Sequence, residues 1–128
     1  MIQKEFVPYE EALALKELGF DEKCLCNWEE SWSPEPEHEI RMVLTTDQTW
    51  LRPGWICAPT YSQAFRWFRE KHSLHSNVKC INTTYNNHFR FEIESNSETL
   101  YCRNLFDTYE KAELACLKKL IEIVKLSK

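Results

Sequence analysis

Glycine is scarce in this chain, with 2 in 128 residues, so left-handed turns that require it must be few. No apolar run approaches the roughly 20 residues of a membrane-spanning helix, and the sequence predicts no membrane partner. Residues 1–6 read MIQKEF, without the apolar segment of a secretory signal, which predicts a cytoplasmic protein. Basic residues are not in excess either. The formal net charge of −4 disfavours non-specific binding to nucleic acid or anionic membranes.

Cysteine, by contrast, is plentiful. There are 6 cysteines, and because no export is expected, we predict free thiols rather than a disulfide framework. With 43% hydrophobic residues, a chain of this length has enough apolar surface for one core. We therefore predict a single domain over residues 1–128.

Hydrophobic periodicity indicates the order of helices and strands. Apolar residues at helical spacing predict three helices, and β-prone runs predict a hairpin with an acidic loop and a later antiparallel meander. Asp107 and Glu110 have the spacing of a capping box at the start of the last helix. The predicted class is α+β, a small, mainly antiparallel sheet packed by two or three helices. The predicted helices cover 8–18, 60–72 and 108–126, and the runs of strand cover 24–28, 40–45, 77–84, 88–94 and 100–102.

Three segments together resemble a known group of proteins. They are FVPYEEALALKELGF over 6–20, APTYSQAFRWFREKH over 58–72 and YEKAELACLKKLIEIVK over 109–125. In these the chain is similar to small conserved proteins of unknown function from Bacteroides-type gut bacteria, found especially in their phages, prophages and mobile elements. The resemblance implies a bacterial cytoplasm and a phage or mobile-element origin. It carries over no catalytic residue.

Candidate metal and catalytic groups are few. Cys24 and Cys26 with His72 and His75 come nearest to a zinc set, but their spacing is wrong for a standard knuckle, and we predict no metal and no cofactor. Cys57, shortly before the second helix, is the best candidate nucleophile, with His72, His75 and His88 as the available bases. A thiol packed beneath the start of the helix is the favoured interpretation. We assign no catalytic residue, and a cysteine-dependent enzyme remains an alternative.

A basic and aromatic surface on the second helix suggests another alternative, a small nucleic-acid-binding module. Guanidinium groups beside an exposed indole can bind phosphates and stack bases. Trp67 lies off the apolar stripe of Tyr61, Ala64, Phe65 and Phe68, which suggests partial exposure. The meander might add Lys79 and Arg103. The residues of this alternative are Arg66, Trp67, Arg69, Lys71 and Arg90.

The acidic loop between the first two strands carries the favoured function. A tryptophan is unusual in a solvated loop, and there it can anchor a contact while carboxylates steer the encounter. An ordinary solvated loop is the alternative interpretation. We therefore predict a non-enzymatic protein-interaction factor whose partner is another protein. The predicted contact residues are Trp32, Glu29, Glu30, Glu35 and Glu37.

Overall fold

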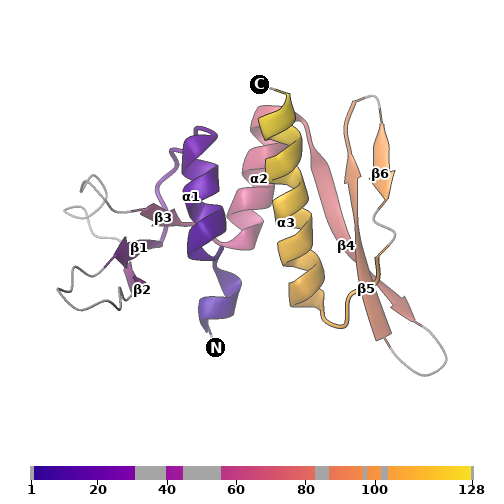
Figure 1. Ribbon diagram of the computed structural model, residues 1–128, viewed down its shortest axis with the longest axis horizontal. Coiled ribbons are helices and arrows are strands. Elements are labelled where there is room, and N and C mark those ends of the chain that lie inside the picture. Colours follow the sequence, from indigo (N-terminus) through magenta and orange to yellow (C-terminus); the bar gives the residue numbers. More distant parts are fainter. Residues whose placement is uncertain are drawn as a thin grey trace. The chain divides into compact units, whose positions relative to one another are not determined.

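The computed structural model describes residues 2–30, 40–44, 56–82, 87–96, 98–101 and 104–127. Within them lie three α-helices and two three-stranded antiparallel sheets (Figure 1). The predicted α+β class is confirmed, although the strands form two sheets rather than the one expected. The chain divides into two compact units, Met1–Thr60 and Tyr61–Lys128. This division does not test the prediction of a single domain, which stays a prediction.

The first helix, α1, follows a short 3-10 turn, Ile2–Glu5, and spans Tyr9–Glu17, as predicted. Pro8 precedes it with φ −60°, an angle that suits a helix start. Gly19 ends it at φ +104°, a conformation that glycine adopts without steric cost. The Gly19 N–H donates to the Lys16 carbonyl at 3.0 Å, and the Phe20 N–H donates to the Leu15 carbonyl at 3.0 Å. This double closure is a Schellman motif, which satisfies carbonyls left open at the helix end.

The first unit also contains a sheet in the order β2-β1-β3, in which both pairings are antiparallel. The predicted hairpin of the first two strands is therefore confirmed. β1 spans Cys26–Glu30, β2 spans Ile40–Leu44 and β3 spans Ile56–Ala58.

A small apolar cluster holds this sheet to the start of the chain. Phe6, Cys26 and Ala58 are buried together, and Trp28 and Met42 pack against them. The Trp28 indole Nε1 donates to the carbonyl of Val7 at 2.9 Å. Because this bond joins β1 to the segment before α1, it satisfies a polar atom of a partly buried ring while fixing that segment on the sheet.

The second unit begins with α2, and a three-stranded meander in the order β4-β5-β6 follows it. Both the second helix and the meander agree with the sequence prediction. Each strand of the meander pairs antiparallel with the next along the chain. The bounds are Tyr61–His72 for α2, His75–Asn82 for β4, Asn87–Glu94 for β5 and Thr99–Tyr101 for β6.

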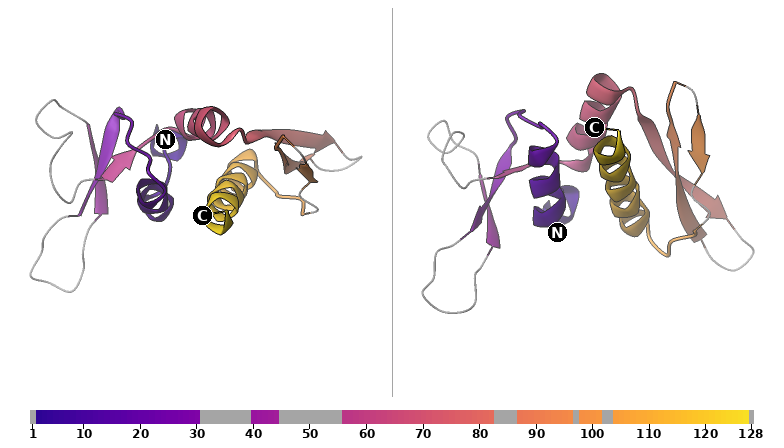
Figure 2. Two further views of the ribbon diagram at one scale, coloured as in Figure 1. Left: turned by 90° about the horizontal axis from the view of Figure 1, so that it is seen from above. Right: turned by 45° about the horizontal axis from the view of Figure 1, so that its top comes forward.

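The last helix, α3, spans Tyr109–Leu126 and packs across one face of the meander (Figure 2). That face carries the apolar side chains of β5 at alternate positions. Phe91 is buried and its ring stacks with Phe106 at 6.3 Å between centroids, while the Phe89 ring meets Tyr109 edge-on at 6.0 Å. Phe89 and Phe106 also exchange two backbone hydrogen bonds, of 2.9 and 2.7 Å. The chain is thus tied to β5 just before α3 begins.

The start of α3 differs from the prediction by one residue. Thr108, not Asp107, is the capping residue, and its hydroxyl accepts a hydrogen bond from the Lys111 N–H at 3.2 Å. Asp107 instead forms an exposed ion pair with the Lys111 side chain at 3.8 Å. Thr108 has the extended backbone (φ −131°, ψ 156°) of a capping residue, so the helix begins one position later than the charge pattern implied.

Candidate functional site

The acidic loop falls largely outside the described part of the chain. Trp32, Glu35 and Glu37 are not among the described residues. Glu29 and Glu30 are the last residues of β1, and their backbones pair with β2. The hairpin that carries the loop is confirmed, and the contact role of these five residues stays a prediction.

The cations predicted on the second helix do lie on an exposed surface of α2. Arg66, Arg69 and Lys71 are all exposed. Trp67, however, is only 3% exposed, and its ring packs edge-on against Phe68 with 5.0 Å between centroids. The expected partial exposure of this indole is therefore wrong. Its burial leaves no free ring face on which a base could stack.

Arg90, the remaining residue of the nucleic-acid alternative, lies on the face of the meander opposite to α3. Its neighbour Phe91 points toward the helix, and strand alternation turns Arg90 the other way. The pairing register sets Lys79 of β4 directly across from it. Arg90 also forms an ion pair with Glu92 at 3.7 Å. This outer face therefore carries charges of both signs.

The first unit contains a pair of cysteines that the sequence analysis did not join. Cys57 is the middle residue of β3, and Cys24 lies two residues before β1. The Cys57 side chain interacts electrostatically with the side chain and the backbone of Cys24. The Cys24 thiol lies 3.4 Å from the Glu22 carbonyl, to which it donates. Because α1 packs against β3, the ammonium group of Lys16 acts on Cys57 as well.

These interactions shift the pKa values of the two thiols in opposite directions. The interaction with the Cys24 side chain lowers the pKa of Cys57 below its ordinary value, and the Cys24 backbone and the Lys16 charge act in the same direction, against burial. The same interaction raises the pKa of Cys24, to which burial and the nearby Glu22 add.

Among the described residues of the first unit, the titratable groups beside Cys57 include a second thiol, Cys24. The histidines predicted as bases, His72, His75 and His88, belong to the second unit. Only one histidine, His38, belongs to the sequence of the first unit, and it lies outside the described residues. In the second unit, the His72 ring contacts Trp67 at 4.9 Å between centroids. Within the described ranges, no three His, Cys, Asp or Glu side chains form a group that could hold a metal ion.

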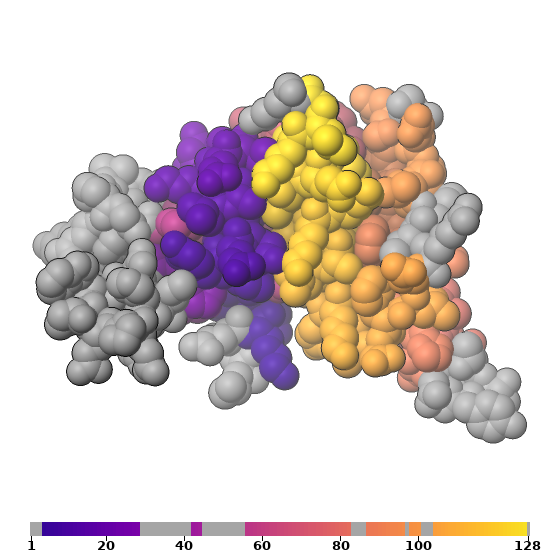
Figure 3. All heavy atoms as spheres, in the orientation of Figure 1, coloured from indigo at the N-terminus to yellow at the C-terminus, as the bar shows by residue number. Residues whose placement is uncertain are grey.

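The second unit has a groove of about 260 Å³ between α3 and the turn that joins β5 to β6. The space-filling view shows a hollow between the yellow helix and the orange strand segment (Figure 3). Its lining is mainly aliphatic, and two charged side chains stand at its rim. The lining residues are Leu74, Ile93, Ser95, Glu98, Leu100, Lys119 and Ile123.

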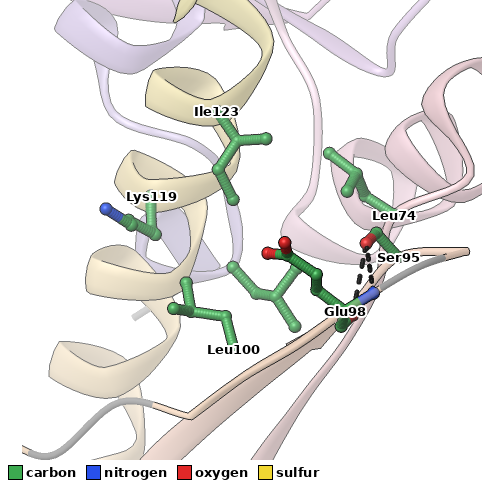
Figure 4. A pocket seen from close by; sticks show the side chains of 7 residues that line it. Leu74, Ser95, Glu98, Leu100, Lys119 and Ile123 are labelled. Carbon is green, nitrogen blue, oxygen red and sulfur yellow. Dashed lines mark hydrogen bonds between the residues drawn. The ribbon is translucent and has the colours of Figure 1, made fainter. Parts of the chain in front are cut away.

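The two charged side chains of the groove point in different directions (Figure 4). The Glu98 carboxylate extends into the space between Leu100 and Ile123, whereas the Lys119 ammonium points away from it. Lys119 forms an ion pair with Glu122 at 3.4 Å. The Ser95 hydroxyl accepts a hydrogen bond from the Glu98 N–H at 3.2 Å, which fixes the turn that carries the carboxylate. Glu98 thus presents a negative charge above an apolar floor.

Neither the thiol pair nor the groove was found from the sequence. The sequence groups Cys24 with Cys26, His72 and His75, because a C-x-C spacing is a local signal, whereas its interaction with Cys57 depends on the pairing of β3 with β1. Glu98 and Leu100 lie in a short turn and a short strand without a motif. The alternation of β6 would have shown that Leu100 and Ile93, its partner in the register, share a face.

In the described part of the chain, no helix is long and apolar enough to cross a membrane. Comparison of the chain with models of protein families, with curated proteins and with solved structures gave no significant match.

Proposed function

We propose that this protein acts by binding another protein, and that acidic groups on it contact a basic segment of that partner. The groove of the second unit carries the proposal, because a carboxylate extends into an otherwise aliphatic space. The acidic loop predicted between β1 and β2 has charge of the same sign. The net charge of −4 also favours a partner with basic surface.

A lysine or arginine side chain is the partner group that fits this groove. Such side chains pack their methylene stems on apolar surface while the charged end meets a polar group. Leu100 and Ile123 supply the apolar contact, and Glu98 supplies the counter-charge. The volume of about 260 Å³ lies just below the roughly 300–1,000 Å³ typical of small-molecule sites. It therefore favours a peptide side chain over a larger cofactor.

Nucleic-acid binding is supported less well. The exposed cations of α2, among them Arg69, favour it, but an exposed aromatic ring beside them is also needed for base stacking. Trp67 is buried. Arg90 is paired with Glu92, which places a carboxylate where a phosphate would bind.

The proposed setting is the bacterial cytoplasm, where the protein would serve as a phage or mobile-element accessory factor that binds and modulates a host protein. The resemblance of residues 6–20, 58–72 and 109–125 to such small proteins supports this setting.

Peptide selection tests the proposed contact without knowledge of the natural partner. A random displayed peptide library is selected on the intact protein, and the enriched peptides are titrated by calorimetry and NMR. We expect lysine or arginine beside apolar residues, and shifts of the methyl resonances of Leu100 and Ile123. Glu98→Gln keeps the side-chain shape and removes the charge. It should weaken binding about tenfold, or about 1.4 kcal/mol.

The matched control is Glu94→Gln, which removes an exposed carboxylate at the end of β5. It should leave the affinity within about twofold, because strand alternation turns its side chain to the face of the meander opposite to Ile93 and the groove. Enriched peptides that bind Glu98→Gln as tightly as the wild type would contradict the proposed contact. Selection of acidic peptides, or of none, would contradict it as well.

A further inference from the structure

The groove beside Glu98 has room for one side chain, so the backbone of a bound segment needs partners of its own. A volume of about 260 Å³ accommodates a lysine or arginine side chain, whereas the N–H and C=O groups of the segment lie outside it. β6 adjoins the groove, because its middle residue, Leu100, belongs to the lining. β6 is also the last strand in the order β4-β5-β6, so among the described strands of this unit none pairs with its outer edge. Such an edge presents backbone groups to another chain.

The hydrogen bonds of the hairpin show which backbone groups of β6 face this outer edge. The Ser95 N–H donates to the Glu98 carbonyl at 2.8 Å. Along an antiparallel pair, residues that exchange backbone hydrogen bonds alternate with residues that do not. The next bonded position on β6 is therefore Leu100. It follows that the N–H and C=O groups of Thr99 and Tyr101 point away from β5, toward the outer edge.

The groove and the outer edge of β6 meet on one face of the meander. Leu100 is paired with Ile93, which is buried on the face that α3 covers. Because α3 packs over β5 and β4, it leaves Leu100 39% exposed. The Glu98 carboxylate extends over this uncovered part (Figure 4). A strand placed beside β6 would continue the sheet here, and its side chains on this face would reach the groove.

We propose that the basic segment of the partner binds as an extended strand, antiparallel to β6, and adds a fourth strand to the meander. The inference rests on the proposed contact with Glu98 and states how the rest of the segment is held. A lysine or arginine opposite Leu100 shares its face and reaches Glu98, its diagonal neighbour, as long side chains can. The two residues that flank it pair their backbones with Thr99 and Tyr101. Main-chain hydrogen bonds then give affinity, and the side chain in the groove gives specificity.

Charge and backbone pairing favour a basic strand at β6 over other arrangements. β6 contains no lysine or arginine, so a second copy of this strand does not supply the counter-charge for Glu98. A helix satisfies its own backbone groups, and it would leave those of Thr99 and Tyr101 to water. β4, at the opposite edge of the sheet, carries Lys79 and no acidic residue, which disfavours a basic segment there.

Amide hydrogen exchange of the intact protein, measured by NMR, tests the pairing without a mutation. The probe is the tightest-binding basic peptide from the library selection, made synthetically. At saturating peptide the Thr99 amide should exchange at least about tenfold more slowly, because pairing with a strand protects a backbone N–H. The Leu100 amide, which points toward β5, serves as the internal control. Its protection should change less than that of Thr99.

N-methylated forms of the same peptide test the register of the added strand. A methyl group on the backbone nitrogen of either residue that flanks the basic residue removes its hydrogen bond to β6. It should weaken binding at least about tenfold. Methylation of the basic residue itself is the matched control. Its N–H points away from β6, so the affinity should change less than about twofold.

The outcomes separate strand addition from the contact on which it rests. If no enriched peptide depends on Glu98, the proposed contact is wrong and strand addition falls with it. If binding depends on Glu98 while the Thr99 amide stays unprotected, or while protection appears only in β4, the contact stands and strand addition is wrong. Equal losses of affinity for all the N-methylated forms would overturn the antiparallel register.

Discussion

Thr108 shows how much of a helix start depends on a single hydroxyl. It caps the first turn of α3 by accepting from the Lys111 N–H at 3.2 Å, one of the donors that a helix start leaves without an internal partner. Asp107 stands next to it, but its carboxylate binds the Lys111 side chain instead. The backbone N–H therefore depends on the threonine.

Thr108→Val removes the hydroxyl and keeps the branched shape, so it should lower the free energy of unfolding by about 1 kcal/mol. Urea titration monitored by far-UV circular dichroism measures this loss. Asp107→Asn is the control, and it should change the stability less, because its ion pair is exposed. If Asp107→Asn lowers the free energy of unfolding more than Thr108→Val does, then Asp107, and not Thr108, is the effective cap.

Trp67 shows where a helical pattern misleads. The sequence predicts one apolar stripe on α2 with Trp67 outside it, but the helix packs against both α3 and β4. A helix with two neighbours buries a wider face, so Tyr61, Ala64, Trp67 and Phe68 are all buried. The stripe indicates that a helix exists. It does not indicate how many neighbours the helix has.

At the scale of elements, the helices and strands could be predicted because their signals are local. Proline and glycine mark the ends of α1, and the alternation of β5 separates Phe91 from Arg90. The pairing of β3 with β1 could not be predicted, because it joins segments distant in sequence and β3 has only three residues. The interaction of Cys24 with Cys57 depends on this pairing, and it was missed for the same reason.

The hairpin of β1 and β2 carries one tryptophan within its strands and another in its acidic loop, which allows a paired test. Trp32→Ala should leave the thermal melting temperature almost unchanged and weaken capture of a protein partner. The expected loss of affinity is ~2 kcal/mol or more, because a tryptophan at the centre of an interface commonly contributes this much. A thermal melt and a pull-down with the captured partner measure the two effects.

Trp28→Ala is the matched control on the same hairpin. This indole donates to the Val7 carbonyl at 2.9 Å and meets the Tyr9 ring at 6.5 Å between centroids, so its removal should lower the melting temperature by several degrees. A comparable fall for Trp32→Ala would assign Trp32 to the core. The prediction that it anchors a partner would then be abandoned.

At the scale of the molecule, a single domain predicts that the two units unfold together. Phe91→Leu loosens the core of the second unit, where Phe91 stacks on Phe106, and should cost about 1–2 kcal/mol. If the chain is one domain, the amides of the first unit should lose as much protection against hydrogen exchange as those of the second. Its reporter is the Val7 amide, which bonds to the Pro59 carbonyl at 2.8 Å.

Native-state hydrogen exchange measures both units in one experiment. The exchange free energies of the Val7 amide and of the central amides of α3 should fall by equal amounts in Phe91→Leu. A fall confined to α3 would show two domains that unfold separately. Trp28→Ala, a core substitution in the first unit, should likewise lower the exchange free energies of the Val7 amide and of the central α3 amides by equal amounts.

Gly19 ends α1 with a positive φ of 104°, which D-amino acids favour and L-amino acids avoid. No heavy atom lies within 4 Å of the place that a Cβ would take there, so an L-residue would be opposed by its own backbone and not by its surroundings. A D-residue has the mirror-image preference. D-alanine at this position, introduced by chemical ligation, would favour the turn that glycine merely permits, because it also restricts the unfolded chain. D-alanine at position 19 should therefore raise the free energy of unfolding, although ribosomal synthesis cannot incorporate it.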